Sequence, residues 1–136
     1  MAIAGYSGTP LIKKLGIKPE MKILVLNAPD NYFALLEQDI TLQLIKGKQI
    51  PDFIHLFAKD IAAFTKGMQK VLPFAGANTS VIVWVSWYKK SAGIATDLNE
   101  NIIRDFALQN NLVDIKVCAV SDLWSGLKLV VPVAKR

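Results

Sequence analysis

Residues 81–100 read VIVWVSWYKKSAGIATDLNE, and this stretch decides the fold class. Residues 81–87 are rich in apolar side chains and predict a buried strand. A polar loop with one glycine follows over 88–96, and Asp97 is expected to open a helix. In an α/β sheet, ligands bind where strands end and helices begin. The stretch therefore marks where a site would lie, without naming a chemistry.

The rest of the chain alternates strands and helices in the same way. The expected strands are 22–27, 40–46, 52–58, 80–87, 113–120 and 127–133. The expected helices are 9–15, 30–37, 60–72 and 97–109. Their first residues are the capping residues Thr9, Asp30, Asp60 and Asp97. Gly16 is expected to end the first helix and Asn110 the last. Residues 22–27 are expected to be buried on both faces, and 40–46 to be half covered near a sheet edge. The last two strands are joined by a short connection and must be antiparallel.

This pattern predicts one domain of the α/β class. We expect a doubly wound, mostly parallel sheet of about six strands, Rossmann-like but reduced, with an antiparallel hairpin at its C-terminal end. The chain has 136 residues, which is the usual size of a single domain. Hydrophobic residues make up 52% and charged residues 20%, a composition that argues against disorder.

Charge and cysteine content limit the compartment and the partners. The net charge is +5, but only two of the 16 basic residues are arginine, and the lysines are spread along the chain. A solvated lysine-rich surface is therefore favoured over nucleic-acid binding. A single cysteine excludes an internal disulfide. With no apolar run of about 20 residues and no signal-peptide pattern, we expect a cytoplasmic protein with no membrane contact.

Two resemblances follow from these elements. An α/β sheet closed by a helix and an antiparallel hairpin is similar to the fold of S-adenosylmethionine-dependent methyltransferases. Four segments, 5–11, 14–19, 87–100 and 112–130, together resemble a bacterial domain-of-unknown-function family of small cytoplasmic proteins. The second resemblance implies kinship and supplies no reaction.

The methyltransferase resemblance implies a cofactor site whose residues are missing here. Such enzymes have a glycine-rich turn after the first strand, whereas residues 27–31 read NAPDN, without glycine and with a rigid proline. They also place an acid at the end of the second strand, where this chain has Lys46-Gly47-Lys48. We therefore predict no cofactor of that kind.

Polar and aromatic residues are expected to gather along the edge where the strands end. The candidate ligand-binding residues are Asn27, Asp30, Ser86, Trp87, Lys89, Lys90, Thr96, Asp97, Asp122, Trp124 and Ser125, with Lys59 and Tyr88 beside them. Lysines, hydroxyls and the helix start at Asp97 would suit an anionic group, although the charge of Asp97 itself opposes one. The competing interpretation is a loop held by capping and turn hydrogen bonds.

The residues most often used in catalysis offer little here. His55, the only histidine, lies in the middle of a strand between apolar neighbours and is expected to be buried and hydrogen-bonded. Cys118 lies inside a strand and is expected to behave as a small hydrophobic residue. No zinc spacing occurs, so no metal site is predicted, although magnesium needs only one or two carboxylates.

The leading hypothesis is a binding module, non-catalytic or of undetermined activity, for an unknown small molecule or a protein partner. Two alternatives stay open. One is a divergent S-adenosylmethionine-dependent transferase with an altered cofactor site. The other is a self-associating module, a homodimer paired through residues 40–46 or through the terminal hairpin, because sheet edges leave backbone groups free.

Overall fold

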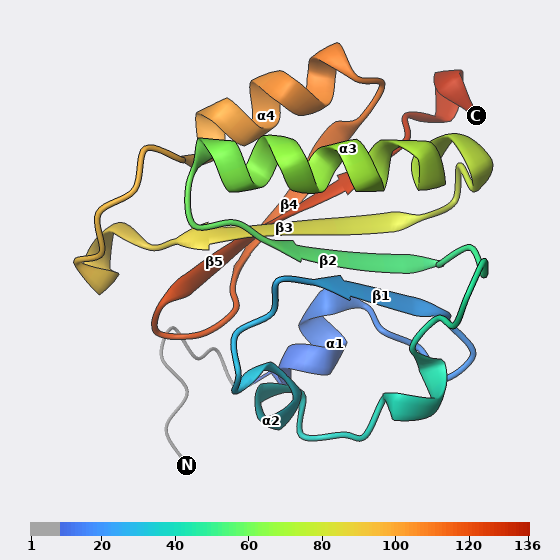
Figure 1. Ribbon diagram of the computed structural model, residues 1–136, viewed down its shortest axis with the longest axis horizontal. Helices are drawn as coiled ribbons and strands as arrows, with labels where there is room; N and C mark the ends of the chain where they lie inside the picture. Colours follow the sequence, from blue (N-terminus) through green and yellow to red (C-terminus); the bar gives the residue numbers. More distant parts are fainter. Residues whose placement is uncertain (1–8) are drawn as a thin grey trace.

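The sheet is formed by β1 (Ile23–Leu26), β2 (Phe53–Phe57), β3 (Ile82–Tyr88), β4 (Val113–Ala119) and β5 (Trp124–Val130). These bounds come from a computed structural model, which describes residues 9–136. The described strands form one five-stranded sheet in the order β1-β2-β3-β5-β4 (Figure 1). Strands β1, β2 and β3 are parallel, and β5 is antiparallel to both β3 and β4. The α/β class and the C-terminal antiparallel hairpin are confirmed.

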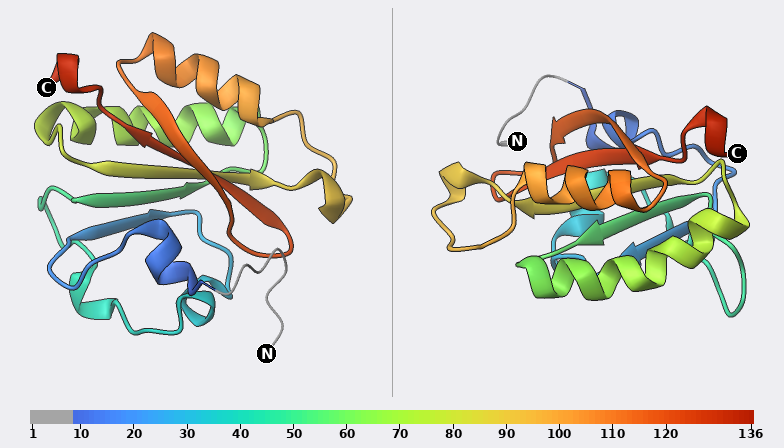
Figure 2. Two further views of the ribbon diagram at one scale, coloured as in Figure 1. Left: turned by 180° about the vertical axis from the view of Figure 1, so that it is seen from behind. Right: turned by 90° about the horizontal axis from the view of Figure 1, so that it is seen from above.

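Helices cover both faces of this sheet. They are α1 (Leu11–Leu15), α2 (Tyr32–Leu36), α3 (Ile61–Ala77) and α4 (Glu100–Gln109). Helices α3 and α4 lie on one face, and α1 and α2 lie on the other (Figures 1 and 2). Each face has its own apolar core, as a doubly wound sheet requires.

Alternating side chains of the central strands supply the two cores. Leu56 and Val85 point towards α3 and α4, whereas Phe57 and Trp84 point towards α1 and α2. Trp84 is fully buried, and its indole N–H donates a hydrogen bond of 2.9 Å to the carbonyl of Leu15. This bond fixes the end of α1 against the middle of the sheet.

The expected strand at 40–46 is wrong. Residues Thr41–Gln43 form a 3₁₀ helix, and only one isolated bridge, from Ile23 to Leu44, joins this segment to β1. The carboxylate of Asp39 accepts hydrogen bonds from the backbone N–H and the hydroxyl of Thr41. The Gln43 side-chain amide donates to two backbone carbonyls of the loop between α1 and β1. The Asp39 bonds favour a local turn over a strand ladder, and the Gln43 bonds hold the segment against a loop distant in the chain.

The position of β1 also differs from the prediction. Because no strand forms over 40–46, β1 lies at the edge of the sheet. Only Ile23 of its four residues is buried, so β1 is not covered on both faces. The connection between β4 and β5 is shorter than expected, and Trp124 is the first residue of β5 rather than part of the loop.

Three of the four expected helix starts are displaced. Pro10, not Thr9, precedes α1, and Asn31, not Asp30, precedes α2, in both cases without a side-chain cap. Helix α4 begins at Glu100, where the Asn99 side chain accepts from the N–H of Ile102, so Asp97 does not open it. The start of α3 is confirmed, because Asp60 Oδ1 accepts from the N–H of Ala63 at 2.8 Å.

Candidate functional site

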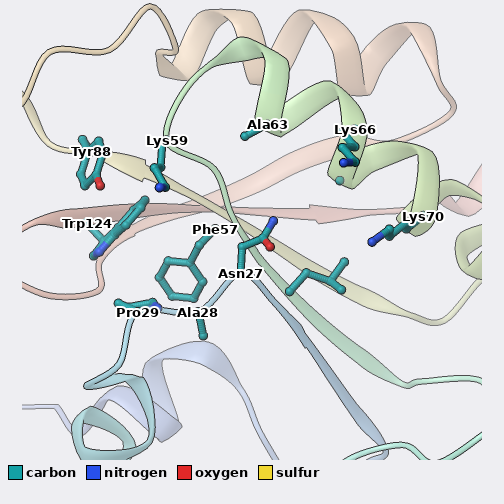
Figure 3. Close-up of a pocket in the computed structure, with 12 residues that line it drawn as sticks. Asn27, Ala28, Pro29, Phe57, Lys59, Ala63, Lys66, Lys70, Tyr88 and Trp124 are labelled. Carbon is teal, nitrogen blue, oxygen red and sulfur yellow. The ribbon is translucent and has the colours of Figure 1, made fainter.

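A groove opens at the carboxyl ends of the parallel strands, between β1 and the N-terminal half of α3 (Figure 3). Its volume is about 480 Å³, which falls in the range of small-molecule sites. We call it the lysine groove. It is lined by Leu26, Asn27, Ala28, Pro29, Phe57, Lys59, Ala63, Lys66, Gly67, Lys70, Tyr88 and Trp124.

Three aromatic side chains form a wall that runs from one end of the lysine groove to its middle. Phe57 ends β2, Tyr88 ends β3, and Trp124 begins β5 directly opposite Tyr88. The rings of Tyr88 and Trp124 stack with centroids 4.3 Å apart, and Phe57 meets Trp124 edge to face at 5.0 Å. Contacts of this geometry stabilise aromatic pairs and hold each ring in place.

A buried hydrogen-bonded chain supports this wall from behind. The ring of His55 stacks on Phe57 at 4.3 Å. His55 Nδ1 lies 2.9 Å from the Tyr32 hydroxyl, and His55 Nε2 lies 2.7 Å from Ser86 Oγ. Burial lowers the pKa of His55 to about 3 and raises the pKa of the Tyr32 hydroxyl. A neutral imidazole offers one donor and one acceptor, so both of its nitrogens are satisfied.

Three lysines surround the groove. Lys59 follows β2, and Lys66 and Lys70 lie one helical turn apart on α3. All three are exposed, and within residues 9–136 none of them forms an ion pair. No acidic side chain of the described residues lines the groove. The groove therefore combines uncompensated positive charge with an apolar, aromatic interior.

Asn27 lies between the two ends of the groove (Figure 3). Its φ of 58° falls in the left-handed region, which asparagine tolerates better than most residues other than glycine. The chain thus makes a tight turn after β1 although the turn has no glycine. The prediction that this turn binds no methyltransferase cofactor stays a prediction.

The structure divides the candidate residues chosen from the sequence. Asn27 and Trp124, with the neighbouring Lys59 and Tyr88, line the lysine groove. A second, wider hollow of about 1030 Å³ lies beside the loop between β3 and α4. Its lining includes Trp87, Lys89, Lys90, Thr96, Asp97 and Ser125. Asp30 and Asp122 are exposed and line neither hollow, and Ser86 is fully buried in its bond to His55.

Thr96 and Asp97 attach this loop to the start of α3. Thr96 Oγ1 donates to the carbonyl of Lys59 at 2.6 Å, and Asp97 Oδ1 accepts from the N–H of Ile61 at 2.8 Å. Together with Asp60, two carboxylates therefore occupy the N-terminus of α3. Asp97 therefore offers no helix start to an anion: with Asp60 it accepts from two of the N–H groups at the start of α3, where the two carboxylates would repel an anion.

Sequence reasoning missed Phe57, Lys66 and Lys70. The signal for the lysines was present, since Ala63, Lys66, Gly67 and Lys70 recur at the spacing of one helix face. Two small residues alternate with two long cations on that face, which leaves space beside the helix. Phe57 was recognised only as a neighbour of His55.

Other kinds of site find no support in the described residues. In residues 9–136, no three histidine, cysteine, aspartate or glutamate side chains gather where they could hold a metal ion. Cys118 is half-buried on β4, and burial raises the pKa of its thiol. None of the helices in this part of the chain is both long and apolar enough to cross a membrane.

Comparison with known proteins identifies a distant structural likeness. No protein-family model and no curated protein matches the sequence, so membership of the bacterial family that it resembles stays a prediction. Among solved structures, the chain is similar to a protein of the NADB-Rossmann superfamily from Streptococcus agalactiae. The two are 5% identical with a TM-score of 0.43, over 92% of this chain and 69% of that one. Nothing about the activity of this chain follows from a likeness at that level.

Proposed function

We propose that this chain binds a small anionic molecule in the lysine groove. The observation that carries the proposal concerns residues 9–136: among them, the three lysines around a largely apolar groove have no ion-pair partner, and no acidic residue lines the groove. An anion entering the groove would gain charge-assisted contacts to ammonium groups while its apolar part is removed from water. The fixed aromatic wall supports the same proposal, because a preformed site loses little entropy on binding.

A thermal-shift screen of nucleotides, acyl-coenzyme A esters and phosphorylated metabolites tests the proposal. A ligand at about 100 times its Kd stabilises the native state by roughly 2.7 kcal/mol. In a domain of this size, that corresponds to a rise in Tm of roughly 5–10 °C. We expect at least one anionic compound to produce such a rise in the wild type.

Two double variants give this screen its control. Lys66→Gln with Lys70→Gln removes two charges from the groove, and Lys46→Gln with Lys48→Gln removes two from an exposed turn outside it. The first pair should abolish most of the shift and the second should leave it intact. A screen without any stabilising anion, or equal losses in both variants, would contradict the proposal.

The transferase alternative has one observation in its favour, the tight turn at Asn27. The charge of the lysine groove opposes it, because S-adenosylmethionine carries a net positive charge and would be repelled by three lysines. Calorimetry with this cofactor and with its neutral-sulfur demethylated product separates the two hypotheses. Binding of the cofactor at micromolar concentration would favour the transferase, and absence of binding at millimolar concentration would exclude it.

A further inference from the structure

We infer that the ligand of the lysine groove is a phosphorylated compound with a flat ring, the ring against the aromatic wall and the phosphate between Lys66 and Lys70. The inference rests on the proposed function and specifies its ligand class. It depends on how the groove is divided along its length.

The two ends of the groove differ in chemistry. Tyr88, Trp124 and Lys59 lie at one end, and Lys66 and Lys70 lie at the other (Figure 3). Phe57 and Asn27 lie between them. A ligand that fills the groove therefore meets ring faces and edges at one end and two ammonium groups at the other.

The aromatic end is built for a flat group. Trp124 is only 6% exposed, and its position is fixed by the stack with Tyr88 and by the edge contact with Phe57. Behind Phe57, the fully buried His55 prevents that ring from retreating. A rigid apolar surface of this kind favours a planar ring over a flexible chain, since the ring loses fewer internal rotations on binding.

The cationic end suits a doubly charged group. Side chains four residues apart on a helix are neighbours, so Lys66 and Lys70 reach the same small volume. On the same face of α3, the small residues Ala63 and Gly67 keep the helix surface low enough for a ligand to approach. A phosphate monoester carries close to two negative charges and three oxygens, and so contacts both lysines at once.

The placement of the phosphate is fixed by exclusion as well. In α/β proteins, phosphates commonly bind at helix N-termini. Here the start of α3 is occupied by Asp60 and Asp97, whose carboxylates accept hydrogen bonds from two of its N–H groups and would repel a phosphate. The phosphate therefore lies against the side of α3 rather than at its end.

Calorimetric titration of the wild type with matched probes tests this inference. Adenosine monophosphate and phenyl phosphate carry a ring and a phosphate, adenosine carries only the ring, and ribose 5-phosphate and inorganic phosphate carry only the anion. We expect adenosine monophosphate to bind at least about tenfold more tightly than either adenosine or ribose 5-phosphate, given the usual contribution of ring stacking. Phenyl phosphate decides whether a single ring suffices or a nucleoside is required.

Variants assign each half of the ligand to its end of the groove. The double variant Lys66→Gln, Lys70→Gln should reduce adenosine monophosphate affinity to that of adenosine and leave adenosine unchanged. Phe57→Leu should reduce the affinity for adenosine monophosphate towards that for ribose 5-phosphate. If this variant fails to fold, the comparison of probes on the wild type still measures the contribution of the ring. The exposed pair Lys46→Gln, Lys48→Gln should change nothing.

The outcomes distinguish this inference from the proposed function. If ribose 5-phosphate binds as tightly as adenosine monophosphate, the ring contributes nothing and the inference is overturned, while anion binding stands. If adenosine binds as tightly as its phosphate, the phosphate contact is overturned. If no anionic compound binds and the lysine variants behave as wild type, the inference and the proposed function both fail.

Discussion

His55 is the residue on which the interior of the molecule depends most directly. It is fully buried, it is the only histidine in the chain, and it joins α2 to β3 through Tyr32 and Ser86. The core favours the neutral ring, because a charged imidazole would lie in a low-dielectric interior with no opposite charge beside it. The support of the aromatic wall is thus tied to the protonation state of one side chain.

This dependence predicts a loss of stability in mild acid. The pKa of His55 is about 3 in the native state and near 6.5 in the unfolded chain, so below pH 6.5 only the unfolded state binds the proton. The free energy of unfolding should fall by roughly 2 kcal/mol as the pH is lowered from about 7.5 to 5. Most of this loss occurs at pH values higher than those at which carboxylates titrate.

Urea unfolding at half-unit pH steps measures this loss. His55→Gln cannot titrate and should remove the slope between pH 6.5 and pH 5, whatever its effect on stability at pH 7.5. A flat wild-type profile over that interval would show that the histidine is not held neutral.

At the scale of elements, α3 decides the shape of the site. Its Gly67 is fully buried against β2, and a Cβ built there would lie 2.5 Å from Leu56 Cδ1. The sequence alone suggests that alanine at this position would stabilise the helix by about 1 kcal/mol. The structure reverses that expectation, because the glycine allows α3 to approach the sheet closely.

Gly67→Ala should therefore destabilise the protein by roughly 1 kcal/mol net. The reason is that the cost of overpacking against the buried Leu56 exceeds the gain in helix propensity. Gly76→Ala is the matched control on the same helix, since a Cβ there would meet nothing within 4 Å. It should be neutral or stabilising. Denaturant midpoints compare the two variants, and a Gly67→Ala protein as stable as Gly76→Ala would refute the packing argument.

At the scale of the whole molecule, the strands of the sheet differ in how far they are buried. Strand β3 lies between β2 and β5, and both of its faces are packed by helices or buried side chains. Strand β4 is at the opposite edge from β1, and its Ile115 and Val117 are each more than half exposed. Residues 40–46, one of the two surfaces considered for self-association, do not form a strand. The terminal hairpin, whose exposed edge is β4, is the other surface.

Rates of amide hydrogen exchange should follow this difference in burial between the central strands and β4. We expect amides of β2 and β3 to exchange only through global unfolding, and those of β4 to exchange by local opening at least about tenfold faster. Mass spectrometry or NMR under native conditions gives the rates. Slower exchange in β4 than in β3 would indicate that the edge strand is covered, for instance by a second copy.

The elements predicted well from the sequence are those whose signals are local. The apolar runs of β2 and β3 and the cap at Asp60 each act within a few residues of the element that they specify. Residues 40–46 were misassigned because Gln43 bonds to carbonyls more than 20 residues away. Asp97 was assigned to the wrong helix for the same reason, since it caps α3 from 36 residues further along the chain.

The sequence by itself determined the α/β class, the order of the main elements and the burial of His55, because periodicity and capping are properties of neighbouring residues. Only the tertiary structure brought Lys66 and Lys70 of α3 beside Asn27 of the β1 turn and Trp124 of β5. Those residues are far apart in the chain, and their approach depends on how closely α3 packs on the sheet at Gly67. Within the stretch 81–100, the loop after β3 begins at the same end of the sheet as the lysine groove, and packing and charge favour that groove for the proposed binding site.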